Sequence, residues 1–194
     1  MPIEKYTYSG PIDHTLPVDI SKLVGKSVII TGGANGMGET GVRHFVAAGA
    51  NVIIADVNKR GYDLAEEINK KHGSDRTTFV EVDIRDWDQQ KKMFETALSK
   101  FGAVDIVIAN AGISRSSGDS LWNLDDPNGE PTKPNLRIVD VNLKGSFYTW
   151  KLAVHYWRKQ EESEERDRCF IITGSMVGWI DSPVSMLSFH KTIS

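Results

Sequence analysis

A glycine-rich stretch, TGGANGMG, runs from Thr31 to Gly38, directly after one apolar run and directly before a helical pattern. Gly32, Gly36 and Gly38 would permit a tight turn, bring the backbone close to a pyrophosphate, and let the helix pack on the preceding strand. The first turn of that helix, which includes Met37, would offer free N–H groups and a positive dipole end to phosphates. The stretch therefore predicts a dinucleotide-binding loop, with a purely structural turn as the alternative.

An acidic residue ends the next apolar run: Asp56 follows NVIIA and lies eighteen residues beyond Gly38. A carboxylate at this place can accept hydrogen bonds from both hydroxyls of an adenosine ribose, whereas it would repel a 2′-phosphate. The residue therefore favours NAD over NADP as the cofactor. NADP stays open, because Lys59 and Arg60 could receive a phosphate, and the acid could also simply open a turn.

The elements that must position these residues can be read from the hydrophobic pattern. Five short apolar runs, most of them β-branched, have the composition of strands that are buried on both faces, and helical patterns separate them. Such alternation requires right-handed crossovers and predicts an α/β fold with a doubly wound, Rossmann-like parallel sheet. The expected strands are residues 27–31, 51–55, 78–82, 104–109 and 169–173, and the expected helices run up to Gly49 and over 62–71, 87–101 and 136–157.

The domain organisation is expected to be simple: an N-terminal extension over residues 1–25 and one dinucleotide-binding domain over residues 26–194. The stretch 113–134 is polar, rich in glycine and proline, and follows the fourth expected strand. Because α/β sheets bind ligands at the carboxyl ends of their strands, it is a candidate substrate-side loop, with a solvated linker as the alternative. The charged run 158–168 has mixed signs and is interpreted as a solvated turn.

The composition limits the classes of partner. The chain has 194 residues and a formal net charge of −3, which gives no electrostatic reason to expect nucleic acid or an anionic membrane, so a small-molecule partner is expected. The N-terminus lacks the apolar segment of a signal peptide, and no run approaches about 18 apolar residues, so a cytoplasmic location is expected. The histidines show no metal-ligand spacing, so no metal is expected. The single cysteine, Cys169, lies in an apolar run and is expected to be buried and inert.

Five motifs together resemble those of the short-chain dehydrogenase/reductase family. The residues within these motifs are similar to those of fungal members that tailor secondary metabolites. They occur in the order typical of the family, each on the expected element. The motifs are TGGANGMG, VDI with Asp83, ANAG over residues 109–112, VNLKG over 141–145, and IITGS, which ends at Ser175.

The resemblance implies a role for each matching residue. Asp83 would accept a hydrogen bond from the adenine amino group, and Asn110 would line the cofactor cleft. Asn142 would hold a helix bend and a water in a proton relay, and Lys144 would lie near the cofactor. Ser175 would bind and polarise the substrate oxygen. The implied reaction is hydride transfer between NAD or NADP and a secondary alcohol or ketone.

The acid-base residue that the family uses is not at its expected place. Family members carry a tyrosine thirteen or fourteen residues beyond the serine, and a lysine four residues later lowers its pKa, because a free tyrosine titrates near pH 10. Here those two positions are Ser188 and Phe189, and Lys191 follows Phe189 by only two residues, which places it on another helical face. The residue four before Lys191 is Leu187. Weak catalysis is therefore expected, with a non-catalytic dinucleotide-binding protein or a truncated gene product as alternatives.

The resemblance also implies that the doubly wound sheet is incomplete at the C-terminus. Family members continue with two further strands and a substrate-covering segment, so CFIIT (169–173) is expected at an unpaired, apolar sheet edge. A helix that usually builds the family's dimer interface would be missing as well. A homo-oligomer therefore stays open but is not favoured.

Overall fold

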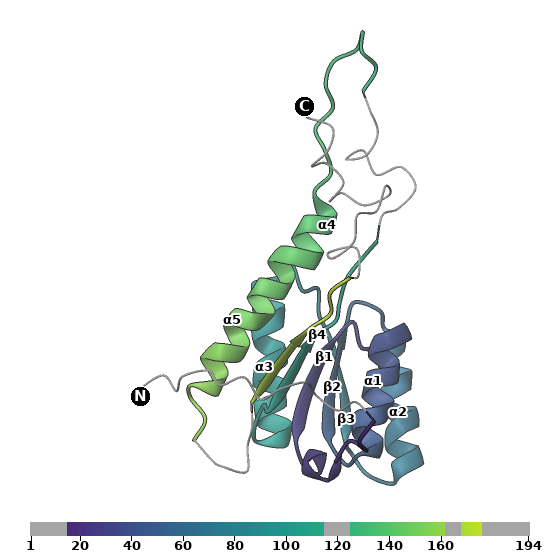
Figure 1. Ribbon diagram of the computed structural model, residues 1–194, viewed down its shortest axis with the longest axis vertical. Coiled ribbons are helices and arrows are strands. Elements are labelled where there is room, and N and C mark those ends of the chain that lie inside the picture. The colour runs from purple at the N-terminus through teal and green to yellow at the C-terminus, as the bar shows by residue number, and fades with distance from the viewer. Residues whose placement is uncertain (1–14, 115–124, 162–167, 176–194) are drawn as a thin grey trace.

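The computed structural model describes residues 15–114, 125–161 and 168–175. Within them, five parallel strands form one sheet in the order β3-β2-β1-β4-β5, which helices cover on both faces (Figure 1). The predicted doubly wound α/β fold is confirmed. The strands are β1 (Ser27–Thr31), β2 (Asn51–Asp56), β3 (Thr77–Glu81), β4 (Ile106–Ala109) and β5 (Cys169–Ile172). The helices are η1 (Ser21–Leu23), α1 (Gly36–Ala47), α2 (Arg60–His72), α3 (Trp87–Phe101), α4 (Arg137–Val139), η3 (Asp140–Gly145) and α5 (Ser146–Trp157).

Strand β1 lies at the centre of the sheet, and its side chains alternate between two apolar clusters. Val28 and Ile30 belong to the cluster under α1 and α2, while Ile29 belongs to the cluster under α3 and α5. All three side chains are almost completely buried. A strand that is covered on both faces has no polar side to alternate with, which explains its continuous apolar sequence.

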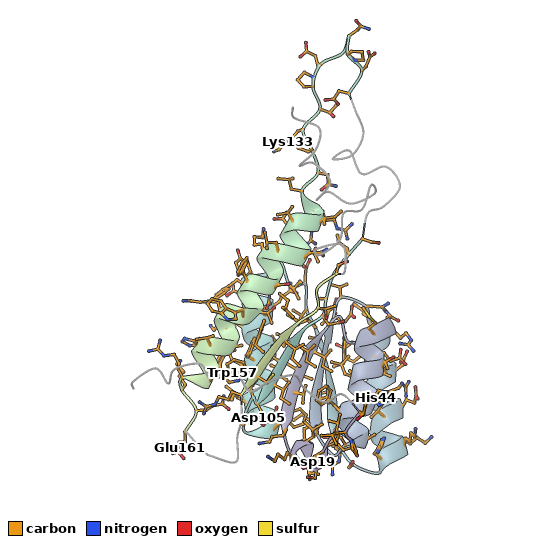
Figure 2. The ribbon with its side chains drawn as sticks, in the orientation of Figure 1. Asp19, His44, Asp105, Lys133, Trp157 and Glu161 are labelled. Atoms are coloured by element: carbon orange, nitrogen blue, oxygen red, sulfur yellow. The ribbon has the colours of Figure 1, made fainter. Side chains whose placement is uncertain are left out.

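The amino ends of the central strands are fixed by a buried carboxylate. The Oδ2 atom of Asp105 accepts a hydrogen bond from the backbone N–H of Ser27 at 2.8 Å, which joins the start of β1 to the segment that leads into β4. Nearby, the indole N–H of Trp157 donates to the carbonyl of Val104 at 3.0 Å. Figure 2 shows Asp105 and Trp157 at this end of the molecule, whereas Lys133 lies far beyond the opposite, carboxyl end of the sheet.

The start and end of α3 follow from its sequence. The carboxylate of Asp86 accepts from the backbone N–H groups of Asp88 at 2.9 Å and Gln89 at 3.0 Å, as an N-cap residue does. Gly102 ends the helix with φ of 76°, in the left-handed region that glycine adopts without strain. The helix predicted over residues 87–101 is therefore confirmed at both ends.

The single helix expected over residues 136–157 is wrong in its middle. The structure has a short α4, then the π-helical segment η3, and only then the regular helix α5. The buried side chain of Gln90 supports this irregular stretch: its Nε2 donates to the carbonyls of Ile84 and Gly145, the latter at 2.9 Å, and its Oε1 accepts from the Thr149 hydroxyl at 2.7 Å. These bonds join α3 to the end of η3 and the start of α5, and they give buried carbonyl groups a donor.

The expectation that Cys169 is buried is also wrong, because its side chain is exposed. Strand β5 pairs only with β4 among the described residues, so it lies at an edge of the sheet, as predicted for CFIIT. Ile171 and Ile172 are exposed as well, by 43% and 60%. The burial prediction assumed that an apolar run is covered on both faces, and here the edge position leaves it open.

The structure covers the two interrupting segments only in part. Residues 1–14 of the extension and 115–124 of the candidate substrate-side loop lie outside the described residues, as does the segment 176–194 that contains Phe189 and Lys191. The assignment of the loop to the substrate side therefore stays a prediction. In the described part of the chain, no helix is long and apolar enough to span a membrane.

Candidate functional site

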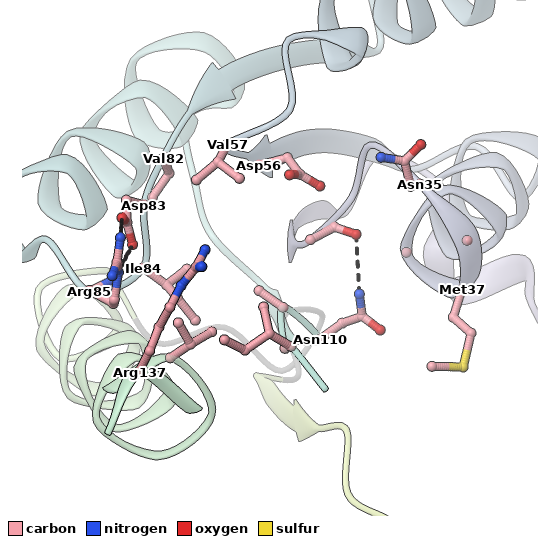
Figure 3. Close-up of a pocket in the computed structure, with 17 residues that line it drawn as sticks. Asn35, Met37, Asp56, Val57, Val82, Asp83, Ile84, Arg85, Asn110 and Arg137 are labelled. Carbon is pink, nitrogen blue, oxygen red and sulfur yellow. Dashed lines mark hydrogen bonds and ion pairs between the residues drawn. The ribbon is translucent and has the colours of Figure 1, made fainter. Parts of the chain in front are cut away.

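A cleft of about 400 Å³ opens at the carboxyl ends of β1 to β4 (Figure 3). The sheet order reverses between β1 and β4, and such a switch point is where open α/β sheets bind ligands. Each of the four strands leads into a loop that lines the cleft, and Arg137 of α4 and Val141 of η3 line one side. The lining residues are Gly32, Asn35, Gly36, Met37, Gly38, Asp56, Val57, Val82, Asp83, Ile84, Arg85, Asn110, Ala111, Gly112, Ile113, Arg137 and Val141.

The glycine-rich loop follows β1 and ends in the first turn of α1. Gly32 and Gly36 have φ of 65° and 53°, so both occupy the left-handed region that other residues rarely adopt. A Cβ atom on Gly38 would lie 2.0 Å from the carbonyl oxygen of Gly32, so only glycine fits where the helix meets the loop. The Asn35 side chain does not cap α1, and the first turn of this helix, Gly36 to Gly38, lines the cleft with N–H groups that have no partner within the helix.

The carboxylate of Asp56 is held against this loop. Its Oδ2 accepts from the backbone N–H of Ala34 at 3.0 Å, and its Oδ1 accepts from the N–H of Asn58 at 2.9 Å. Each carboxylate oxygen has a second lone pair, so the group can still accept hydrogen bonds from a ligand. Asp56 therefore has a fixed position at the wall of the cleft.

The two cationic side chains that follow Asp56 in the sequence, Lys59 and Arg60, both lie close to carboxylates. The Arg60 guanidinium forms an ion pair with Glu39 at 2.5 Å and also contacts the carbonyl of Ala34, and Lys59 lies 3.6 Å from a Glu81 carboxylate oxygen. Hydrogen bonds, first from Arg60 and then from Arg43, lower the pKa of Glu39. The carboxylate that holds Arg60 is therefore ionised at neutral pH.

Thr31 and Asn110 join the ends of β1 and β4 beneath the loop. The Thr31 hydroxyl oxygen accepts from the N–H groups of Asn110 at 3.1 Å and Ala111 at 3.0 Å. The Asn110 amide donates in return to the carbonyls of Thr31 at 3.0 Å and Gly32 at 3.3 Å. Asn110 lines the cleft, as the resemblance implied, whereas Thr31 lies behind the lining and positions the loop.

Asp83 lies at the end of the cleft away from α1 and pairs with Arg85 (Figure 3). The Nε atom of Arg85 lies 3.0 Å from each carboxylate oxygen, and the Arg85 backbone N–H also donates to Oδ1 at 2.9 Å. The Arg85 hydrogen bond is the main reason why the pKa of Asp83 is lowered. The carboxylate is therefore charged and oriented before any ligand arrives.

The three remaining predicted site residues do not line this cleft. Asn142 lies in η3. Its Oδ1 accepts from the backbone N–H of Ile113 and its Nδ2 donates to the Ile113 carbonyl, both at 2.9 Å. The bend predicted at Asn142 is therefore a π-helical turn, tied to the loop after β4. The Lys144 ammonium forms an ion pair with Asp140 at 2.6 Å, and Ser175 lies exposed, three residues beyond the end of β5.

Comparison with known proteins decides the family. The family model described as short chain dehydrogenase matches residues 26–184. The chain belongs to the short-chain dehydrogenase family. It is 32% identical to the 5′-hydroxyaverantin dehydrogenase of Dothistroma septosporum, over 86% of this chain and 57% of the relative. It is 37% identical to the short-chain dehydrogenase/reductase prx4 of Penicillium roqueforti, over 90% of this chain and 47% of the relative.

Solved short-chain dehydrogenases share the fold. One is a 3-ketoacyl-(acyl-carrier-protein) reductase from Brucella melitensis, complexed with NADH, with a TM-score of 0.66 and 29% identity over 80% of this chain and 59% of that chain. Another is a short-chain type dehydrogenase/reductase from Mycobacterium marinum, with a TM-score of 0.69 and 28% identity over 85% of this chain and 62% of that chain. The present chain spans about half the length of the curated relatives it matches.

The sequence reasoning missed several residues of this dehydrogenase cleft. Val57 and Ile84 each follow a predicted acid by one residue, so the strand ends could have indicated them. Arg85 pairs with an acid only two residues earlier. Arg137 had no such signal, because five residues and a change in helix type separate it from Asn142.

Proposed function

We propose that the chain is an NAD-dependent oxidoreductase of the short-chain dehydrogenase family that interconverts a secondary alcohol and a ketone. The observation that carries the proposal is the cleft at the switch point, where a glycine loop and a fixed carboxylate meet. The fungal relatives favour a substrate from secondary metabolism. A nicotinamide dinucleotide would supply the hydride, and the protein would bind and orient both reactants.

The residues present fit such a cofactor. The approach between Gly38 and Gly32 leaves no room for a Cβ atom, so the backbone itself forms the surface that a pyrophosphate would meet. The free N–H groups at the start of α1 would donate to the phosphates. Asp56 would accept from the ribose hydroxyls, and Asp83 would accept from the adenine amino group.

The charges around Asp56 support NAD over NADP. A 2′-phosphate would meet the Asp56 carboxylate, which two backbone N–H groups hold in place. The charge of Arg60 is already partly balanced by its ion pair with Glu39, which weakens its attraction for such a phosphate. Lys59 is likewise near Glu81. Repulsion from Asp56, with both nearby cations paired to carboxylates, therefore favours NAD.

The sequence supports slow proton transfer. Ser175 would bind the substrate oxygen, and Asn142 would hold the loop after β4 through its bonds to the backbone of Ile113. Ser188 and Phe189 occupy the positions at which the family carries tyrosine, and neither is a suitable general acid. Loss of positioned acid-base catalysis lowers a rate by about 10²- to 10⁴-fold.

A second candidate function is dinucleotide binding without catalysis. The side chain at Phe189 favours it, because phenylalanine has no proton to exchange and Lys191 is spaced two residues away rather than four. Both candidates require the same cleft. They differ only in whether bound NADH reacts.

Turnover separates the two candidates. We expect slow oxidation of NADH by a panel of ketones at high protein concentration. The decrease in NADH absorbance measures the rate. Ser175→Ala should reduce this rate by about tenfold or more, since it removes a group that stabilises the reacting oxygen. Bound NADH that is never oxidised, in the wild type as in the variant, would contradict the oxidoreductase proposal and support the binding protein.

A further inference from the structure

Arg137 is a cleft residue that the motifs of the chain do not account for. It begins α4, and its side chain extends from the helix into the cleft (Figure 3). Among the described residues, its guanidinium has no hydrogen bond or ion pair, whereas Arg85 and Arg60 are paired with Asp83 and Glu39. Arg137 is therefore a cation that faces the cleft with its donors and its planar surface available.

The position of Arg137 along the cleft can be given from its neighbours. It approaches Asp83 closely enough to contribute, after Arg85, to the lowered pKa of that carboxyl group. The glycine loop with Met37 lies on the other side of the cleft (Figure 3). Arg137 is therefore at the end where an adenine would lie, and the phosphates would lie at the far end.

The surroundings of this end suit a flat aromatic ring. Val57, Val82 and Ile84 supply apolar wall there, and Asp83 supplies the acceptor for an amino group. A guanidinium is planar and weakly hydrated, so it stacks on aromatic faces more readily than an ammonium does. The apolar wall and the guanidinium together would enclose a ring between them.

We propose that Arg137 forms one face of the adenine subsite and stacks its guanidinium on the adenine ring. This inference rests on the proposed dinucleotide binding and adds a residue that determines affinity at its adenine end. The contact involves the ring face alone. It therefore applies equally to NADH and NADPH, and the choice between them stays with Asp56.

The test measures the dissociation constants of NADH and NADPH for the wild type, Arg137→Ala and Arg137→Lys. A stacked guanidinium predicts that Arg137→Ala weakens both cofactors by the same factor, about 5- to 30-fold, as cation–π contacts of this kind contribute. Arg137→Lys should recover less than half of the loss in binding free energy, because it keeps the charge without the plane. Arg158→Ala, which removes an exposed arginine just beyond α5, is the matched control and should bind as the wild type does.

Three outcomes would overturn the inference. A loss confined to NADPH would assign Arg137 to a 2′-phosphate, full recovery by Arg137→Lys would assign it a simple charge contact, and an unchanged NADH constant would leave it no role. Thermal unfolding of each variant checks the fold. Because Arg137 is exposed, the midpoint temperature of the Arg137 variants should equal that of the wild type. A wild-type chain that binds neither cofactor would overturn the proposed function, and this inference with it.

Discussion

Replacing Gly38 with alanine is expected to weaken NADH binding by at least about 100-fold while the domain remains folded. The added Cβ atom would lie 2.0 Å from the Gly32 carbonyl oxygen and 2.8 Å from the Asn110 amide nitrogen. The backbone of the loop must move to relieve this contact, because a carbonyl oxygen cannot rotate away as a flexible side chain can. The surface that would receive the pyrophosphate moves with it.

The expected loss in NADH affinity is at least about 100-fold, since each lost hydrogen bond from a loop N–H to a charged phosphate costs about 1.5–3 kcal/mol. Isothermal titration calorimetry measures it. Gly41→Ala is the matched control in the same helix, because its Cβ atom would meet only Ile30 Cδ1 at an ordinary 3.6 Å. A folded Gly38→Ala variant with the wild-type NADH constant would contradict the assignment of this loop to the phosphates.

Replacing Asp56 with asparagine is expected to shift the preference from NADH toward NADPH by about 100-fold. Loss of a charged acceptor for the ribose hydroxyls weakens NADH binding by about 1.5–3 kcal/mol. Removal of the negative charge also ends the repulsion of a 2′-phosphate, and Arg60 lies near enough to the loop to attract it. Asparagine keeps one acceptor oxygen for the N–H of either Ala34 or Asn58, and its amide nitrogen cannot accept from the other, so one of these two bonds is lost. Thermal unfolding of the variant checks that the domain still folds.

The measurement is the ratio of the NADPH and NADH dissociation constants. Asp63→Asn removes the same charge from an exposed position in the first turn of α2 and should leave the ratio unchanged. If Asp56→Asn also leaves the ratio unchanged, Asp56 does not contact the ribose, and the preference for NAD has another origin.

The sheet could be predicted from the sequence because its strands are buried on both faces. Strand β1 is predicted to the residue, and α3 begins and ends at local signals, Asp86 and Gly102, that act within one turn. Strands, caps and glycine turns depend on neighbouring residues. Their order along the chain then leaves one topology, the doubly wound sheet.

The errors come from contacts between distant parts of the chain. The carbonyl of Gly145, at the end of η3, accepts a hydrogen bond from Gln90, which lies more than fifty residues earlier in the sequence. Cys169 is exposed because β5 lies at a sheet edge, and composition does not report edge position. Hydrophobic periodicity describes one element at a time, so it could predict neither the π-helical segment nor the exposure of Cys169.

The candidate site divides in the same way. Asp56 and Asp83 follow strands directly, so their place at the carboxyl edge could be predicted from the alternation of elements. Arg137 reaches the same cleft from the start of α4, more than twenty residues beyond the end of β4. Its position depends on how that helix packs on the sheet, which a single sequence does not reveal.

The central claim is that the cleft at the switch point binds NAD(H), and calorimetric titration of the wild-type chain with NADH and NADPH tests it most directly. We expect NADH to bind with a dissociation constant at least about tenfold below that of NADPH, a difference of about 1.4 kcal/mol. No binding of either cofactor, or tighter binding of NADPH, would contradict the account.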